Sequence, residues 1–210
     1  MATSDAFWMN TAREKILMAI ENLVLKNRSY RRFNRGAPVE RRTLRQLVNL
    51  ARLSPSAANL QPLKYILTCS PQKNSLIYPC LSWAGYLKDW AGPKDEERPS
   101  AYIILLGDKE IKRDFSFDAG IAAQSIMLGA VEKGLGGCII ESIDRDSLRD
   151  TLRIPSRYVI LLVLALGVPG EDVILETVSK NGDVRYWRDS EGRHHVPKRR
   201  IEDIIVEEYT

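Results

Sequence analysis

Three polar stretches of this sequence have residue types suited to binding an anion or the edge of a flat ring. "KNRSYRRFNR" (26–35) places several guanidinium groups beside the Ser29 hydroxyl, and such groups suit a phosphate. "SPSAAN" (54–59), followed by Gln61, offers amide side chains and non-helical backbone groups that can bond to a heteroaromatic ring. "PKRR" (197–200) adds further cations. A phosphate at one end and a ring edge at the other describe a mononucleotide such as flavin mononucleotide (FMN).

Signatures of other chemistries are missing from the sequence. It contains no G-x-x-x-x-G-K-[ST], H-E-x-x-H or G-x-S-x-G motif. His194 and His195 are adjacent on an expected hairpin and therefore point to opposite faces, which makes them poor partners on one metal ion. Cys69, Cys80 and Cys138 are widely spaced, without a CxxC pair, so neither a zinc site nor a disulfide framework is indicated. These absences favour a reaction carried by a bound organic cofactor, with no metal.

The charge of the chain is mild, with 31 basic and 27 acidic residues and a net charge of +4. The basic residues gather near both ends, where they can be solvated faces as well as an anion site. Tyr30 and Phe33 are too few aromatic residues for a nucleic-acid surface, so we expect no nucleic-acid partner.

Length and composition favour one α+β domain over residues 1–210, with 44% hydrophobic residues and a flexible start at 1–11. No apolar run reaches the ~20 residues of a membrane span, and the N-terminus lacks a signal-peptide layout. We therefore expect a cytoplasmic protein without a membrane partner.

Hydrophobic periodicity predicts the elements that position the polar stretches. Helices are expected at 12–25, 40–53, 83–90, 118–133 and 145–152, with Asp144 as the cap of the last one. Strands are expected at 63–69, 100–107, 136–142 and 158–168, and a hairpin at 184–196. The helix at 118–133 is apolar nearly all round and rich in small residues, so it should be buried with close neighbours. The irregular order of elements favours an α+β sheet flanked by helices.

Four motifs in this order resemble the flavin-dependent nitroreductase family over about residues 25–205. They are Asn27–Phe33 ("NRSYRRF"), Ser54–Pro62 ("SPSAANLQP"), Gly134-Leu135-Gly136 with Glu141–Asp144 ("ESID"), and Pro197–Arg200 ("PKRR"). The chain differs from the family pattern at Asn27, Leu63 and Ser142.

The resemblance implies a role for each matching residue. The phosphate and ribityl chain of FMN would be held by Arg28, Ser29, Lys198 and Arg200, and Arg31 would lie near the pyrimidine edge of the ring. Glu141 and Ser142 would lie near the flavin N5, with the Ser142 N–H as donor. The other subunit would contribute Pro55, Ser56, Ala57 and Asn59. Ile140 and Gln61 would also bind the cofactor. Residues 86–95 receive no role.

The resemblance also implies a fold, an activity and an assembly. The fold would be nitroreductase-like, with a central, mostly antiparallel mixed sheet and a C-terminal arm at 197–210 that completes the partner's sheet. A homodimer would use NADH or NADPH to reduce a nitroaromatic or quinone in ping-pong fashion, with the flavin and no side chain performing the chemistry. Other flavin chemistry (reductive dehalogenation, flavin breakdown, azoline oxidation) and flavin binding without turnover are the alternatives.

Overall fold

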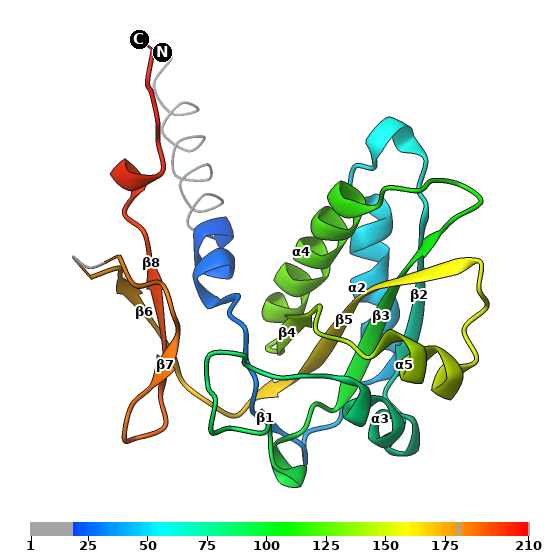
Figure 1. The fold of residues 1–210 in the computed structure, drawn as a ribbon, viewed down its shortest axis with the longest axis horizontal. Helices are drawn as coiled ribbons and strands as arrows, with labels where there is room; N and C mark the ends of the chain where they lie inside the picture. The colour runs from blue at the N-terminus through cyan, green and yellow to red at the C-terminus, as the bar shows by residue number, and fades with distance from the viewer. Residues whose placement is uncertain (1–18, 180–181, 210) are drawn as a thin grey trace, which may run out of the picture.

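The computed structural model of the chain describes residues 19–179 and 182–209. Its main sheet has the strand order β1–β5–β3–β2, and β4 also pairs with β5 (Figure 1). These strands are β1 (Phe33–Asn34), β2 (Leu63–Thr68), β3 (Ala101–Asp108), β4 (Gly136–Ile140) and β5 (Tyr158–Pro169). Each pairing between them is antiparallel.

Helices cover both faces of the main sheet and divide the core into two. On one face, α2 (Arg41–Leu53) and α4 (Ser116–Glu132) pack against Ile103, Leu105 and other residues of β3 and β5. On the other face, α3 (Pro71–Ile77) and α5 (Arg145–Leu152) pack against Ile104 and Leu106. All eight residues of β3 are buried, which confirms that this strand is covered on both faces.

Most of the predicted elements are confirmed, with shifts at their ends. Helical residues 19–26 overlap the helix predicted at 12–25 and extend it by one residue, and residues 12–18 lie outside the described ones. α2 ends before Ser54-Pro55, the Asp144 side chain caps α5, and Gly134 takes the left-handed conformation after α4. β4 ends at Ile140 rather than at residue 142. The short helix α3 was not predicted.

The predicted helix at 83–90 is wrong. Two consecutive turns stand in its place, in which Leu87 N–H donates to Ala84 O (2.8 Å) and Trp90 N–H donates to Leu87 O (3.0 Å). Ala84 has a φ of 43°, in the left-handed region that an α-helix excludes. Immediately before these turns, Ser82 N–H donates to Ser142 O (2.9 Å), which ties the start of the segment to a part of the chain far away in the sequence.

A second, smaller sheet follows β5, with the strand order β6–β8–β7. Its strands are β6 (Val173–Thr177), β7 (Trp187–Arg188) and β8 (His194–Lys198). β7 and β8 are the predicted hairpin, and β6 pairs with β8 in parallel. Figure 1 shows this sheet apart from the main sheet, with helical residues 19–26 between them. We call residues 184–198 the C-terminal hairpin.

The described part of the chain also contains four short 3-10 helices, at Ala57–Asn59, Tyr78–Cys80, Asp95–Glu97 and Ile201–Asp203. Beyond the last of these, the tail runs to residue 209 with its apolar side chains exposed. Within the described residues, no helix has the length and apolar character needed to cross a membrane.

Candidate functional site

One group of predicted site residues gathers around a cavity of about 190 Å³ at the edge strand β4. Residues 29–31 run beside β4, because Ser29 bridges to Gly137 and Tyr30 N–H donates to Gly137 O (3.0 Å). We call this cavity the Arg31–Ser142 pocket. Its lining comprises Arg31, Ser82, Trp83, Ala84, Gly85, Cys138, Ile139, Ile140, Glu141, Ser142 and Tyr186. Arg31, Ile140, Glu141 and Ser142 of the predicted set thus lie around one cavity.

Two parts of this pocket were missed from the sequence. Ser82–Gly85 reaches the pocket because Leu81 bridges to Ile143, and Asp144 N–H donates to Cys80 O (2.8 Å). Tyr186 comes from the C-terminal hairpin. The Trp83 Nε1 is buried, and none of the described residues accepts a hydrogen bond from it. No local pattern signals these contacts, since they join segments far apart in the sequence.

The Arg31 guanidinium is held by residues of the C-terminal hairpin. Only 9% of Arg31 is exposed. Its Nη1 lies 2.9 Å from His194 Nε2, and its Cζ lies 4.5 Å from the centre of the Tyr186 ring. The Tyr186 hydroxyl in turn accepts a hydrogen bond from Tyr86 N–H (3.4 Å). Arg31 therefore links the pocket to the second sheet.

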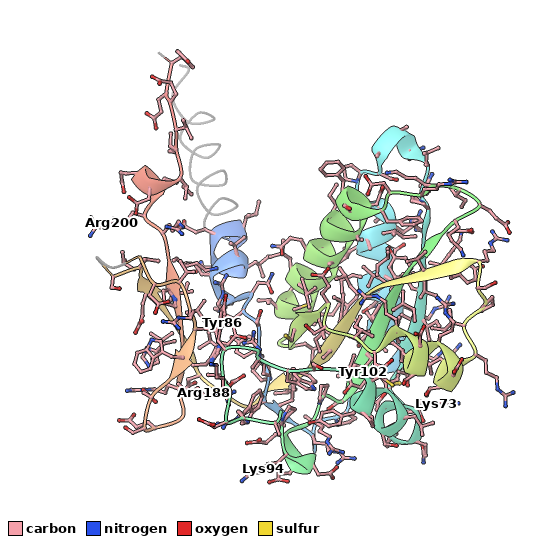
Figure 2. All side chains as sticks on the ribbon, viewed as in Figure 1. Lys73, Tyr86, Lys94, Tyr102, Arg188 and Arg200 are labelled. Carbon is pink, nitrogen blue, oxygen red and sulfur yellow. The ribbon has the colours of Figure 1, made fainter. Side chains whose placement is uncertain are left out.

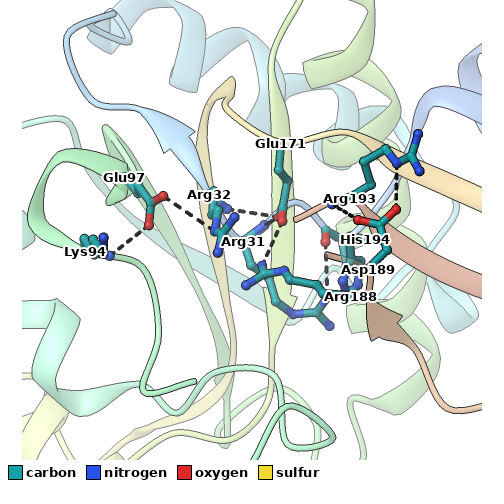
Figure 3. Close-up of polar contacts among 10 residues, drawn as sticks. Arg31, Arg32, Lys94, Glu97, Glu171, Arg188, Asp189, Arg193 and His194 are labelled. Carbon is teal, nitrogen blue, oxygen red and sulfur yellow. Dashed lines mark hydrogen bonds and ion pairs between the residues drawn. The ribbon is translucent and has the colours of Figure 1, made fainter. Parts of the chain in front are cut away.

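Glu171 anchors the second sheet to the same arginine-rich stretch. Its buried carboxylate accepts hydrogen bonds from the backbone N–H groups of Arg31 and Arg32, and it pairs with Arg188 Nη2 at 2.8 Å (Figure 3). Arg188 also lies over the Trp90 ring, 4.2 Å from its centre. Figure 2 shows Tyr86 and Arg188 on the side of the chain where the two sheets approach each other.

The predicted phosphate-binding residues are not brought together by any contact within the described part of the chain. Arg28 Nη2 donates to Val24 O (2.5 Å), Ser29 lies beside β4, and Lys198 and Arg200 are exposed near the end of β8. Arg200 is labelled in Figure 2. The Arg28 Nε is buried, with no described acceptor, and burial lowers the pKa of this guanidinium. A partly buried cation with a spare donor fits an anionic group such as a phosphate.

The junction at 54–61 borders a second cavity, of about 280 Å³. We call it the junction pocket. Its wall includes Pro55, Ser56 and Gln61 from the predicted set, together with Ser54, Tyr65 and Asp118. Pro55, Ala57, Asn59 and Gln61 are exposed. Ala58, Asn59 and Gln61 have φ of 50°, 55° and 50°, so three non-glycine residues take the left-handed conformation, which is costly for such residues.

Asp118 at the start of α4 holds the junction in this shape, and it was missed from the sequence. It is 3% exposed, and its Oδ1 accepts from Ser56 Oγ (2.6 Å) and Ala57 N–H (3.2 Å). Its Oδ2 pairs with Lys112 Nζ at 2.7 Å. Burial alone would raise the pKa of Asp118, but the hydrogen bonds from Lys112, Ser56 and Ala57 outweigh it and lower the pKa.

The two pockets lie on opposite faces and at opposite edges of the sheet. The Arg31–Ser142 pocket is lined by Cys138 and Ile140, which belong to the core under α3 and α5. The junction pocket is lined by Ala51 and Ala122, which belong to the core under α2 and α4. β4 and β2 are three strand spacings apart, or about 14 Å. One chain therefore does not bring the two sets of predicted residues to one ligand.

The histidines and cysteines do not cluster with other potential metal ligands in the described residues. No group of three or more potential ligands is found among residues 19–179 and 182–209. His194 contacts Arg31 and Tyr186, whereas His195 stacks on Trp187 and bonds to Glu176 and Asp189. The two rings thus face opposite ways, as predicted. All three cysteines are free, and burial raises the pKa of Cys80 and Cys138.

Known sequences that match this chain are described as nitroreductases. A family model described as "Nitroreductase family" matches residues 24–168. The Bacillus subtilis (strain 168) protein "Putative NAD(P)H nitroreductase YodC" is 27% identical over 177 residues, which cover 69% of this chain and 87% of that protein. "Putative NAD(P)H nitroreductase MhqN" of the same strain is 22% identical over 187 residues, which cover 70% and 86%.

Solved structures share the fold. An FMN-dependent nitroreductase from Clostridium difficile R20291 superposes with a TM-score of 0.61 at 26% identity, covering 71% of this chain and 87% of that one. A "Putative NADH Oxidase" from Clostridium acetobutylicum gives a TM-score of 0.61 at 21% identity and covers 89% and 99%. The predicted α+β fold, with a mostly antiparallel sheet flanked by helices, is confirmed.

Proposed function

This chain belongs to the nitroreductase family, and we propose that it is an FMN-dependent oxidoreductase that draws its electrons from NADH or NADPH. The observation that carries the proposal is the Arg31–Ser142 pocket. This pocket joins the arginine-rich stretch to the end of β4. The buried Nε of Arg28 and the buried Nε1 of Trp83 have no acceptor among the described residues. These groups fit the phosphate and the ring of a flavin mononucleotide.

The residues of the chain would bind and orient the cofactor. Arg28 and Ser29, with Lys198 and Arg200, are proposed for the phosphate and ribityl end. Bound FMN would supply hydride chemistry, with nicotinamide and acceptor using one pocket in turn. Arg31 would favour the anionic reduced ring, and Ser142 would offer its backbone N–H beside the N5 position, since no described group accepts from that N–H.

We further propose a homodimer in which the junction pocket serves the partner's flavin. The separation of the two pockets within one chain supports this arrangement, because a single chain offers each flavin only part of its predicted contacts. Exposed apolar side chains support it as well: Phe117 and Ile121 of α4 are 73% and 40% exposed, and Val206 of the tail is 98% exposed. A tail of this composition could wrap a second copy and add to its sheet. We also propose that residues 1–210 form a single domain.

The proposed acceptor is a nitroaromatic or a quinone, reduced in ping-pong fashion. Reductive dehalogenation, flavin breakdown, azoline oxidation or flavin binding without turnover would use the same pocket. The three free cysteines suit a reducing compartment, and we propose a cytoplasmic location.

The test uses the purified protein loaded with FMN under anaerobic conditions. NADH or NADPH should bleach the flavin absorbance, and nitroaromatics or quinones added afterwards should restore it. If neither nicotinamide bleaches bound flavin, the oxidoreductase proposal fails. Bleaching without reoxidation by either acceptor class would favour the alternative flavin chemistries.

A further inference from the structure

Arg31 is a buried cation whose partners are neutral. Its Nη1 donates to Ser29 O (3.3 Å) and to His194 Nε2 (2.9 Å), and the Tyr186 ring covers its guanidinium. Among residues 19–179 and 182–209, no carboxylate forms an ion pair with this guanidinium. Burying a cation without a counter-charge is costly. Because no carboxylate among the described residues neutralises Arg31, its positive charge in the pocket wall is available to a bound ligand.

The nearest carboxylate in this network is occupied by other donors. Glu171 accepts from the backbone N–H groups of Arg31 and Arg32, and it forms its ion pair with Arg188 (Figure 3). Glu171 therefore fixes the backbone of the arginine-rich stretch. It does not pair with the side chain that lines the pocket.

His194 has the properties needed to hold Arg31 without neutralising it. It is fully buried, and burial, with the positive charge of Arg31, lowers its pKa to about 4. At neutral pH the ring is uncharged, so Nε2 is the acceptor and Nδ1 carries the proton. A carboxylate at this position would also accept a hydrogen bond, but it would cancel the charge of Arg31.

We propose that His194 is a positioning residue for the cofactor, holding the Arg31 guanidinium in the pocket wall while leaving its charge free to stabilise reduced FMN. The inference rests on the proposed function and deepens it. His194 and Tyr186 both belong to the C-terminal hairpin, which lies beyond residues 24–168 of the family match. The C-terminal hairpin would thus tune the reduction potential of the flavin from outside residues 24–168, the part of the chain that the family model matches.

The experiment compares His194→Gln with His194→Glu, two side chains of similar shape that differ in charge. The flavin midpoint potential and the FMN dissociation constant are measured for each. His194→Gln should leave the potential near that of the wild type. His194→Glu should weaken the preference for reduced over oxidised FMN about tenfold, which lowers a two-electron potential by about 30 mV. His195→Gln is the matched control on the opposite face of β8 and should change neither quantity.

The possible outcomes distinguish a failure of the positioning role of His194 from a failure of the proposed function. Equal potentials for His194→Gln and His194→Glu overturn the positioning role, even where FMN binds and NAD(P)H bleaches it. Failure of the wild-type protein to bind FMN overturns the proposed function itself. If His194→Glu loses FMN altogether, His194→Leu is compared with His194→Gln. The leucine variant removes the acceptor and should lower the potential, and equal values again overturn the inference.

Discussion

Arg28 and Arg31 stand three residues apart but differ in their surroundings, which predicts different effects of mutation. Arg28 has a buried Nε with no described acceptor, whereas Arg31 lines the pocket with neutral partners. A phosphate carries its charge in both redox states, so Arg28→Ala should weaken FMN binding and shift the potential little. A charge-assisted hydrogen bond of about 1.5–3 kcal/mol corresponds to about a tenfold to hundredfold loss of affinity.

Arg31→Ala should do the opposite. Charge develops on the pyrimidine edge only when the flavin is reduced, so this variant should lower the midpoint potential and largely spare FMN binding. Measuring both quantities on both variants tests the division of roles. If the two variants change both quantities alike, the assignment of separate roles to Arg28 and Arg31 is wrong.

The two histidines should titrate in opposite directions from the ordinary value of about 6.5. The pKa of His194 is lowered to about 4, first by burial and then by Arg31, so it favours folding above pH 6.5 and loses that contribution as the pH falls towards 4. The pKa of His195 is raised by its hydrogen bond to Asp189 and by Glu176, so its contribution is complete below pH 6.5 and is lost as the pH rises through its folded value.

Because the chain has only two histidines, proton NMR can follow both rings directly. One imidazole resonance should titrate near pH 4 and the other above pH 6.5. The substitution His195→Gln should remove the higher titration and leave the lower one. Two titrations close to 6.5 would contradict the burial and pairing described for both rings.

Asp118→Asn tests whether the junction is held by a charge. The variant keeps an acceptor for Ser56 but loses the ion pair with Lys112, so unfolding free energy should fall by about 1–3 kcal/mol. FMN affinity of the assembled protein should fall too, because the left-handed residues Ala58, Asn59 and Gln61 lose their support. Urea unfolding and FMN titration measure the two effects. Asp114→Asn is the control, since among the described residues the Asp114 carboxylate accepts hydrogen bonds from Ser116 alone.

At the scale of elements, the position of β4 depends on the absence of a side chain at Gly137. A Cβ there would lie 2.6 Å from the Ala165 backbone oxygen of β5, too close for any real contact. Gly137→Ala should therefore displace β4 and the Ser29 bridge, lower the melting temperature and weaken FMN binding together. Ile139→Ala is the control for the melting temperature alone, because Ile139 is partly exposed on the same strand but also lines the Arg31–Ser142 pocket. An unchanged melting temperature for Gly137→Ala would show that β4 can shift freely.

At the scale of the whole molecule, the exposed apolar side chains of α4 and of the tail predict a dimer. Sedimentation should show two chains per particle, each loaded with FMN. Phe117→Asp with Ile121→Asp should give folded monomers that hold FMN poorly, because the partner's junction is lost. A wild-type monomer that binds FMN at micromolar concentration would contradict both the dimer and the shared site. Lys133→Asp, at the far end of α4, is the charge control.

The sequence by itself determined the elements whose signal is local. Helical spacing located α2, an apolar run rich in small residues located α4, unbroken apolar runs located β3 and β5, and Ser54-Pro55, Asp144 and Gly134 marked helix ends. Motif resemblance then brought Arg31 and Glu141–Ser142 into one predicted site, and the structure places them around one pocket.

Only the tertiary structure decided the contacts between distant segments. His194 reaches Arg31 across 163 residues, and Asp118 reaches Ser56 across 62. Residues 83–90 were expected to be a helix, but they form two turns that follow the pairing of residues 80–82 with residues 142–144. Periodicity reports only which side of an element is buried. Which distant partner covers that side depends on the packing of the whole chain, and so the buried charge of Arg31 and its neutral partners became visible only in the fold.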